Sequence, residues 1–453
     1  MDVTVVGTLV TKIAVLQQEI DLLREKLSTN SENSSIPPSK SFKRKKIKKE
    51  HKKSDRKHGA QPGHVGTYRK PASDTEINNF VSIDAPKKCP MCDGPLSALQ
   101  KSHTHQVHDL ENNQIKITEY QLKKSRCCKC RRVYSGTMPT GVSNSNFGHN
   151  IAAHITSLVV RYHLSKKLIA NIFKEFYNFH ISVGSVSNIE RIVSTSLYQA
   201  YENCATTIKN EEVVHADETR HLQNGVNHWA WVAASSAATV FLLDKSRGKK
   251  VALQLVGKDF SGTLISDRYA AYNFKEPDER QICWSHLKRD FKKISERSGA
   301  PGKIGKALLF YQARVFKYWN KYKEGVISFI TLGSILTSVK KHVENTIYSG
   351  THVAHQATAK TCKNLLKVID GLWTFALKEG VEPTNNHAEQ QIRSFVIYRK
   401  LSFGTRAERG TVFLQRAFSI AATCKKQQKK FIQFVRDSME AFTANSDPPL
   451  LFA

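Results

Sequence analysis

Strand-like segments rich in apolar and β-branched residues follow one another closely in the middle of the chain, and their order constrains the fold more than any other feature. The segments are EEVVHADET (211–219), VNHWAWVAASS (226–236), ATVFLLD (238–244), the helical GKKVALQLV (248–256), GTLISD (262–267) and QICWSHLKRDFKKI (281–294), which indicates a short strand running into a helix. This order is that of the ribonuclease H-like fold, in which the first and fourth strands lie side by side. The sequence therefore predicts a mixed α/β core of this type.

Three acidic residues fall where this fold brings distant segments together. Asp217 ends the first apolar run, Asp267 ends the fourth, and Glu389 opens a helical pattern in TNNHAEQQIR. Gathered carboxylates would hold two magnesium ions, which activate a water or a 3′-hydroxyl and stabilise the leaving oxygen during phosphodiester attack. The pattern favours an enzyme that cuts and joins DNA.

Two of these acids also have a purely structural interpretation at the ends of their strands. Asp217 would cap a turn beside Thr219, and Asp267 would cap a helix that starts at Arg268. Both are frequent uses of aspartate.

Glu389 has its own structural interpretation. With Asn386 as N-cap, Glu389 stands at the capping-box position, and Arg393 lies four residues later, where an ion pair forms on a helix. The three acids together favour a metal site, because a carboxylate falls at each position where this fold brings chains together.

The chain carries far more positive than negative charge. Its 453 residues include 69 Lys and Arg against 39 Asp and Glu, a formal net charge of +30, which indicates a polyanion such as DNA as a partner. The longest stretch free of charge and His, 229–243, is too short to span a membrane, and the N-terminus lacks the pattern of a secretory signal. Nine cysteines, four of them in two paired clusters, suit a reducing compartment. We therefore expect a cytoplasmic, multidomain protein that does not bind membranes.

Residues 1–40 are predicted to form a leucine-zipper-like helix. Its apolar stripe consists of Leu9, Ile13, Leu16, Ile20, Leu23 and Leu27. This spacing is typical of a short coiled coil that joins two copies, and the alternative is an amphipathic helix packed on its own protein. Residues 41–85 are a predicted basic linker, and the lysines and arginines of 43–57 are either simply solvated or neutralise DNA phosphates.

Two cysteine pairs, Cys89 with Cys92 and Cys127 with Cys130, lie within a predicted zinc-binding domain at 86–140. Each pair has the spacing of a knuckle, and the four sulfurs are the set that a tetrahedral structural Zn²⁺ requires, as in a small zinc ribbon. The alternative is a set of buried free thiols or a redox pair. Cys128 is an alternative to Cys127 in this set, and His103, His105 and His108 are weaker candidates for the same ion.

Residues 146–200 follow a helical pattern with the features of a helix-turn-helix. Ser165 and Ser182 are predicted N-caps, and Gly184 is placed in the turn before the candidate recognition helix SVSNIERIV. Helical hairpins that do not bind DNA are common, but the charge of the chain favours the DNA-binding interpretation.

The segment CWSHLKR adds further candidates. His286 would contact the scissile phosphate or assist proton transfer, while Lys288 and Arg289 would bind backbone phosphates. The structural alternative is a helix that packs Trp284 and Leu287 into the core and leaves the other side chains in solvent.

Eight motifs occur in one order along nearly the whole chain: NSENSSIPPS after the leucine-rich helix, CPMC, CCKC, HADET, SDRYAAYN, CWSHLKR, NNHAEQQIR and RKLSFGT. In this combination the chain resembles the transposases of the insertion-sequence-66 family, a branch of the DDE recombinases. The resemblance implies a magnesium-dependent enzyme that hydrolyses the ends of its element and joins them to target DNA, with Asp217, Asp267 and Glu389 as the DDE triad.

The resemblance also implies partners and an organisation. The cysteine knuckles and the helix-turn-helix would help to bind the terminal inverted repeats, small proteins of the same element would be accessory partners, and the protein would act as a homo-oligomer near the bacterial nucleoid. The catalytic domain would span 208–400 with a helical insertion at about 298–383, and a helical tail would follow at 401–453. The candidate DNA-binding residues are His286, Lys288, Arg289 and Arg393.

The chain departs from the family pattern at three positions. Arg220 after HADET, Arg268 after the second Asp and Gln390 after the triad Glu stand where the family commonly has proline, glycine and arginine. Arg268 is expected to pair with Asp267. Two other functions remain open at this point: a catalytically inactive, domesticated DNA-binding relative, and a ribonuclease H-type nuclease that cuts without joining. The coiled coil and the several DNA-binding modules argue against the nuclease, which has no need to bring two ends together.

Overall fold

The computed structural model describes residues 3–34, 73–77, 91, 115–121, 123–126, 128, 133–135, 138–143 and 145–452. The chain divides into two units: 44–116, and the remainder before and after it. In the first unit the described secondary structure is a short 3-10 helix, η2 (Asp74–Glu76). The predicted basic run and the predicted zinc ligands Cys89, Cys92, Cys127 and Cys130 lie outside the described residues.

A small hairpin precedes the helical part of the larger unit. Strand β1 (Lys124–Arg126) pairs antiparallel with β2 (Val133–Ser135), and Ser125 lies opposite Tyr134. Cys128, in the connection between them, is exposed.

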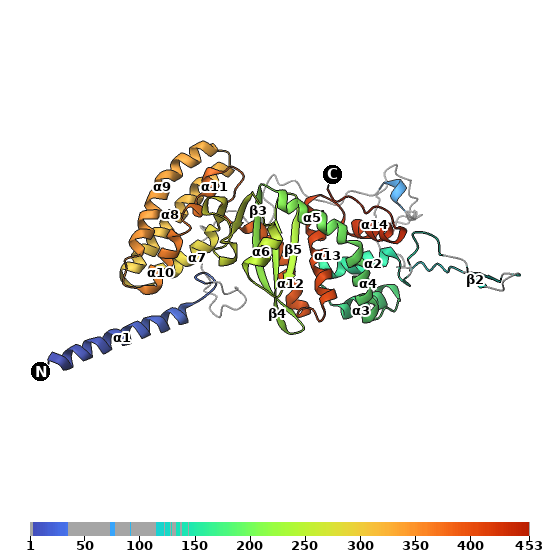
Figure 1. Ribbon diagram of the computed structural model, residues 1–453, viewed down its shortest axis with the longest axis horizontal. Coiled ribbons are helices and arrows are strands. Elements are labelled where there is room, and N and C mark those ends of the chain that lie inside the picture. Colours follow the sequence, from blue (N-terminus) through green and yellow to red (C-terminus); the bar gives the residue numbers. More distant parts are fainter. Residues whose placement is uncertain are drawn as a thin grey trace. The chain divides into compact units, whose positions relative to one another are not determined.

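A five-stranded mixed sheet forms the centre of the larger unit (Figure 1). Its strands and the connecting elements are β3 (Val213–Gln223), β4 (Val226–Ala234), β5 (Thr239–Asp244), α6 (Lys249–Val256), β6 (Thr263–Ser266), η3 (Ala270–Tyr272), η4 (Pro277–Glu279) and β7 (Arg280–Ile282). The strand order is β5-β4-β3-β6-β7, with β3, β6 and β7 parallel and β4 antiparallel to both its neighbours. The five predicted strands and the predicted contact between the first and fourth are thus confirmed.

Strand β3 is longer than its apolar run. It continues from Asp217 to Gln223 because this half pairs with β4 across a two-residue turn. Asn224 and Gly225 both have positive φ, 50° and 76°, as the tight hairpin requires. Asp217 therefore lies in mid-strand rather than at a strand end, and the interpretation of it as a turn cap beside Thr219 is wrong.

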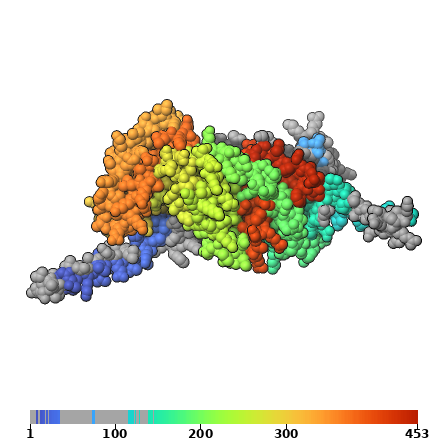
Figure 2. All heavy atoms as spheres, viewed as in Figure 1, coloured from blue at the N-terminus to red at the C-terminus, as the bar shows by residue number. Residues whose placement is uncertain are grey.

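Helices from the end of the chain cover one face of the sheet. They are α12 (Asn386–Ser402) and α13 (Glu408–Lys426), followed by α14 (Phe431–Ala444). Phe241 of β5 packs against Phe395 of α12 and Phe418 of α13, each with ring centroids 5.8 Å apart. Figure 2 shows this red C-terminal segment lying against the green middle of the chain. Helix α6 and η3 contact the opposite face, where Trp231 meets Tyr272.

Helix α13 also supplies hydrogen-bond acceptors to the backbone N–H groups of β5, the outer strand of the sheet. Three backbone N–H groups of β5 donate to side chains spaced one helical turn apart: Thr239 to Thr423 Oγ1 (3.0 Å), Phe241 to Ser419 Oγ (2.8 Å) and Leu243 to Gln415 Oε1 (3.1 Å). An edge strand with free donors is a template for unwanted pairing, and these bonds remove that hazard. The predicted helical tail at 401–453 is thus part of the sheet's own packing.

Three helices lie within 146–200, as the helical pattern predicted: α2 (His149–Val160), α3 (Lys166–Tyr177) and α4 (Val183–Ser196). A fourth helix, α5 (Tyr198–Asn210), was not predicted and leads into the sheet. Ser165 and Ser182 are confirmed as N-caps, because their side chains accept from the N–H groups of Leu168 and Ser185. The placement of Gly184 in the turn is wrong, since α4 begins at Val183 and the chain turns earlier.

The segment at 298–383 is helical, as expected, and has its own apolar core. Its elements, with the helix before it, are α7 (Trp284–Ser295), α8 (Gly299–Lys323), α9 (Phe329–Gly350), α10 (Gln356–Leu366), η5 (Asp370–Leu372) and α11 (Thr374–Leu377). Trp284 packs edge-on against Trp373, and its indole N–H donates to the carbonyl oxygen of Leu372 at 2.7 Å. No helix in the described part of the chain has the length and apolarity needed to cross a membrane.

Helix α1 (Val3–Ser28) presents its apolar stripe to solvent: Leu9, Ile13, Leu16, Ile20, Leu23 and Leu27 are 43–78% exposed. These side chains are therefore not packed on the rest of the described chain, which leaves the stripe free for a partner helix. The coiled coil itself stays a prediction.

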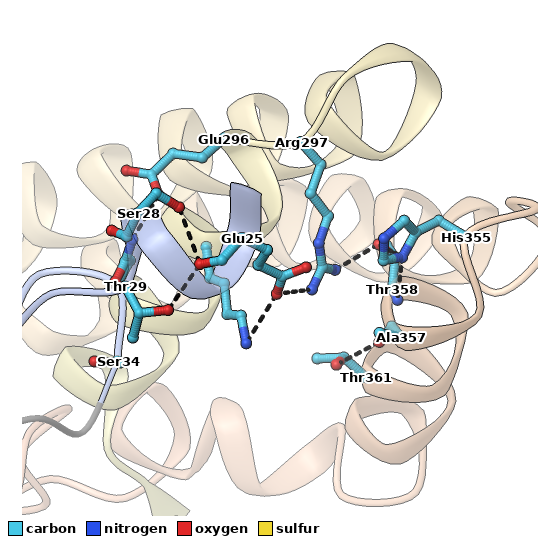
Figure 3. Close-up of polar contacts among 12 residues, drawn as sticks. Glu25, Ser28, Thr29, Ser34, Glu296, Arg297, His355, Ala357, Thr358 and Thr361 are labelled. Carbon is cyan, nitrogen blue, oxygen red and sulfur yellow. Dashed lines mark hydrogen bonds and ion pairs between the residues drawn. The ribbon is translucent and has the colours of Figure 1, made fainter. Parts of the chain in front are cut away.

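The end of α1 contacts the corner between α7 and α8 (Figure 3). Glu25 accepts from Arg297 Nη2 at 2.8 Å and pairs with Lys293 Nζ at 2.9 Å, while Arg297 Nη1 donates to Thr358 of α10 at 2.7 Å. Burial alone would raise the pKa of Glu25, but the two cations lower it. A charged cluster thus attaches the last turn of α1 to the helical insertion.

Candidate active site

Asp217 and Asp267 occupy equivalent positions on adjacent parallel strands. The last paired residues of β3 and β6 are His215 and Ile265, and each aspartate lies two residues further along. Side chains two residues apart leave a strand on the same face, and neighbouring strands are about 4.8 Å apart. The structure therefore brings the two carboxylates together where β6 ends, partway along β3, and we call this place the carboxyl edge of the sheet.

Helix α12 brings Glu389 to the same edge through Asn385, the residue before its first turn. The Asn385 side-chain amide donates to the carbonyl oxygen of Ala216 at 2.7 Å, and its backbone N–H donates to Cys283 Sγ at 3.2 Å. Glu389 stands one turn along, with its N–H donating to the Asn385 carbonyl at 3.1 Å. All three predicted acids thus belong to segments that meet at this edge.

The capping-box interpretation of Glu389 is wrong. The N-cap is Asn385 rather than Asn386, and the Asn385 side chain does not cap the helix because it bonds to β3. Glu389 lies beside His286 and forms no ion pair with Arg393. His286 Nδ1 and Glu389 Oε1 are 3.7 Å apart, which is an ion pair only when the imidazole is protonated.

Asp267 also differs from its structural interpretation. The element after it, η3, begins at Ala270 and has no side-chain cap, so Asp267 does not cap a helix starting at Arg268. Its Oδ1 instead accepts from the Tyr269 N–H at 2.9 Å. The expected pair between Arg268 and Asp267 is absent, because Arg268 bonds to Asp290.

Burial and like charges act together on Asp217. Burial raises its pKa well above the ordinary value of 3.8, and the charges of Glu218, Asp267 and Glu389 raise it further. Carboxylates that repel one another in a poorly solvated site bind either a proton or a cation. The site therefore has the electrostatics of a cation site.

Glu218 is a further acid of this region, with a buried side chain, that the sequence patterns did not single out. Its side chain is 1% exposed; it accepts from the Tyr272 hydroxyl at 2.7 Å and pairs with Arg247 Nη2 at 2.7 Å. The Arg247 guanidinium lies between the rings of Trp229 and Tyr269, 4.3 and 4.0 Å from their centroids. Burial raises the pKa of Glu218, with a further contribution from Asp267. Adjacent residues of a strand face opposite sides of the sheet, so the two acids of the Asp217–Glu218 doublet cannot both face the same side. This doublet was the sequence signal that could have identified Glu218.

Arg280 is a second residue that was missed, and it shapes the loop after β6. The side chain is buried, donating from Nη1 to Asn273 Oδ1 at 2.7 Å and from Nε to Ser266 Oγ at 3.0 Å. It also donates to the backbone carbonyl of Asp267. This buried cation fixes the backbone that carries the second aspartate.

His286 lies beside Glu389, at the start of α7. Ligand atoms of Cys283, His286 and Glu389 are all within 4.8 Å of one another. Within the described structure, His286 Nδ1 and Glu389 Oε1 are buried atoms without a hydrogen-bond partner. Burial lowers the pKa of His286, as does the positive charge of Arg289, while Asp267 and Glu389 oppose the shift.

The other residues of this segment divide between core and surface. Trp284 and Leu287 are fully buried, as the structural interpretation of CWSHLKR predicted. Lys288 is exposed and Arg289 is half-buried, and Arg393 is exposed on α12. These three cations are thus available to a ligand.

The donor atoms fit a divalent cation. Carboxylate oxygens from β3, β6 and α12 are the ligands that magnesium prefers, and one of them, Glu389 Oε1, lacks a hydrogen-bond donor. The sulfur and imidazole of Cys283 and His286 would suit a softer ion.

Comparison with known families agrees with the motifs. Residues 144–412 match the model of the Transposase IS66 family, and residues 3–70 match that of a family of unknown function, DUF6444. A comparison with curated proteins finds no match. The first match covers more than half of the sequence, from the helices before the sheet to the start of α13. The chain therefore belongs to the Transposase IS66 family.

Proposed function

We propose that this transposase is a DDE-type enzyme that cleaves the ends of an insertion element and joins them to target DNA. The observation that carries the proposal is the convergence of Asp217, Asp267 and Glu389, from three separate segments, at the carboxyl edge of the sheet. We also propose that the sheet is the core of a ribonuclease H-like domain, which the strand order β5-β4-β3-β6-β7 supports.

Asp217, Asp267 and Glu389 would hold two magnesium ions. Bound there, the ions would supply Lewis-acid polarisation of the phosphate and stabilise charge on the attacking and leaving oxygens. The Asp217 pKa is raised first by burial and then by repulsion from the neighbouring carboxylates. This repulsion supports the role, because it favours a cation between them.

The chain's own residues would orient the DNA and move a proton. Lys288, Arg289 and Arg393 would bind backbone phosphates on either side of the carboxylates. His286, whose lowered pKa keeps the ring neutral near pH 7, would accept a proton at Nδ1 from the attacking water or hydroxyl.

The reaction would proceed in two displacements. Water attacks the phosphodiester at the element end, releasing a free 3′-hydroxyl; this hydroxyl then attacks a phosphodiester of target DNA and displaces a target 3′-oxygen. Neither step requires a covalent bond to the protein.

A strand-transfer assay with labelled element ends and magnesium tests the proposal. The expected result is end cleavage and joined product for the wild type, with both lost but DNA binding retained in Asp217→Asn, Asp267→Asn and Glu389→Gln. Cleavage that survives any of the three substitutions would refute the assignment. Cleavage without joined product would indicate a nuclease, and binding without cleavage an inactive relative.

The remaining modules would assemble the DNA complex. We propose a structural Zn²⁺ at Cys89, Cys92, Cys127 and Cys130, and recognition of terminal inverted repeats by this module and by α3–α4. Self-association through α1 would bring two ends together, and accessory proteins of the same element would join the assembly near the bacterial nucleoid. The exposed stripe of α1 and the charge of +30 support these roles.

A further inference from the structure

A cavity of about 1020 Å³ opens beside the N-terminal ends of α3 and α4, outside the candidate active site. Its other walls are the Asn224–Gly225 turn and the loop that joins α12 to α13, elements that Figure 1 places at one end of the sheet. We call this cavity the loop groove. Asp217, Asp267 and Glu389 do not line it.

The loop groove carries an excess of positive charge. Its lining includes Lys166, Arg191, Arg406 and Arg409 but only one acid, Glu190. Lys166 and Glu190 neutralise each other through a 2.5 Å ion pair in which the glutamate side chain is buried. Arg191, Arg406 and Arg409 form no ion pair with a carboxylate of the described residues, although the charge of Arg409 acts on Glu190 and opposes the rise of its pKa.

These guanidinium groups are accessible. All three arginines are exposed, and Arg191 uses its guanidinium only on the neutral side chain of Asn188, with bonds of 3.1 and 3.2 Å. Within the described chain, Arg406 and Arg409 form neither a hydrogen bond nor an ion pair. Such a set is complementary to a chain of phosphates.

An exposed aromatic residue stands at the rim. Phe403, directly after α12, is 84% exposed and lines the groove. Its backbone is in the left-handed region, with φ 59° and ψ 15°, which is rare for a bulky L-residue. A bulky ring in an unfavourable backbone conformation, with most of its surface in water, points to a function rather than to packing.

The residues after Phe403 hold the loop rigidly against the sheet. Gly404, at φ +105°, lies so close to β3 that a Cβ atom would come within 2.2 Å of the Leu222 carbonyl oxygen. Thr405 then donates to the same carbonyl at 2.9 Å and accepts from the Asn224 N–H at 2.7 Å. The backbone directly after Phe403 is thus fixed against β3 before any ligand binds.

We propose that the loop groove binds an unpaired segment of DNA, with Arg191, Arg406 and Arg409 on its phosphates and Phe403 stacked on a base. The chemistry is that of a single-strand platform, a basic track beside an aromatic face. The inference rests on the proposed function, since α12 carries Glu389 in its first turn and Phe403 directly after its last. At about 1.5 Å per residue, the two lie roughly 20 Å apart on one rigid element.

The test is binding of a fluorescein-labelled 20-nucleotide oligothymidylate to the full chain, followed by anisotropy in EDTA over a range of salt concentrations. Phe403→Ala is expected to weaken binding roughly 5- to 150-fold, and Phe403→Trp to restore it with quenching of the added tryptophan. The matched control is Phe310→Ala, which removes an exposed ring of α8 outside the groove.

Arg406→Gln with Arg409→Gln is expected to lower the slope of log affinity against log salt by about 1.4, or about 0.7 for each lost phosphate contact. Arg314→Gln with Lys317→Gln, two exposed cations on α8, is the charge-matched control and should leave the slope nearly unchanged. Far-UV circular dichroism checks that each variant is folded.

The inference is overturned if Phe403→Ala binds the oligonucleotide as tightly as the wild type, or if the salt slope of the double arginine variant is unchanged. The groove would then be a site for a protein partner. This outcome is separate from the proposed function, because the assay contains no metal and needs no cleavage. If both variants bind the oligonucleotide more weakly and the protein never cleaves DNA, the binding role of the groove is supported and the proposed cleavage reaction is rejected.

Discussion

The side-chain amide of Asn385 donates to the carbonyl oxygen of Ala216 at 2.7 Å, and this bond joins the helix that carries Glu389 to the strand that carries Asp217. Both residues are fully buried, so water does not substitute for the donor. A neutral hydrogen bond between residues 169 positions apart thus helps to set the relative position of two of the three acids.

Asn385→Ala should therefore reduce stability and activity together. Loss of a buried donor leaves the Ala216 carbonyl unpaired, and we expect the free energy of unfolding to fall by about 1–3 kcal/mol. Denaturant unfolding and end cleavage measure the two effects. The control is Asn386→Ala, at the exposed neighbouring position; equal losses in both variants would contradict the role given to the bond.

The stability that Asp217 contributes to the metal-free protein should fall as pH rises above about 4. Asp217 has a folded-state pKa well above its ordinary 3.8, so the folded chain keeps a proton that the unfolded chain releases, and unfolding becomes easier as pH increases. Magnesium should reverse this trend by replacing the proton. Melting temperatures in EDTA and in magnesium, between pH 4 and 8, test both statements, and Asp217→Asn should flatten the difference.

Glu218→Gln should weaken the support of the Asp267 loop. The change removes the anion that pairs with Arg247, and since Arg247 is partly exposed we expect a loss of about 1–2 kcal/mol rather than that of a fully buried pair. Cleavage should also drop, because Arg247 stacks on Tyr269 beside Asp267. Glu212→Gln, just before β3, is the control; an unchanged unfolding curve for Glu218→Gln would reject the supporting role.

One zinc ion per chain is expected, and elemental analysis of the purified protein measures it. Cys89→Ser should lose the ion because three thiolates bind a structural zinc far less well than four. Cys128→Ser should keep the ion. Loss of zinc from this variant would show that Cys128, rather than Cys127, belongs to the ligand set.

Leu16→Glu with Ile20→Glu should convert the protein to monomers, because charges within an apolar seam prevent the helices from pairing. Light scattering after size-exclusion chromatography gives the mass. Val15→Glu, at an exposed position of α1 outside the stripe, should leave the assembly intact. A double variant that keeps the wild-type mass would show that α1 does not join the copies.

Local features of the fold were predictable from the sequence. The five strands follow from runs of β-branched residues, and Ser165 and Ser182 cap their helices because an N-cap needs only the next three residues. The adjacency of Asp217 and Asp267 followed from strand order, which restricts the possible topologies.

Features that depend on distant partners were not predictable. Glu218 bonds to residues 29 and 54 positions away. The Asn385 amide bonds to the Ala216 carbonyl, and Asn386, the predicted N-cap, is instead the first residue of α12. Cys283 joins His286 and Glu389 only because α12 starts at the end of β7. Nothing in a short window of sequence marks such contacts.

The bonds from β5 to α13 have a consequence for synthesis on the ribosome. Each joins residues 172 to 184 positions apart, so the outermost strand is translated long before the side chains of Gln415, Ser419 and Thr423 exist. During that interval the outer side of β5 is unprotected in the nascent polypeptide. Chaperones, or slow assembly of the incomplete sheet, must then prevent this strand from pairing with other chains.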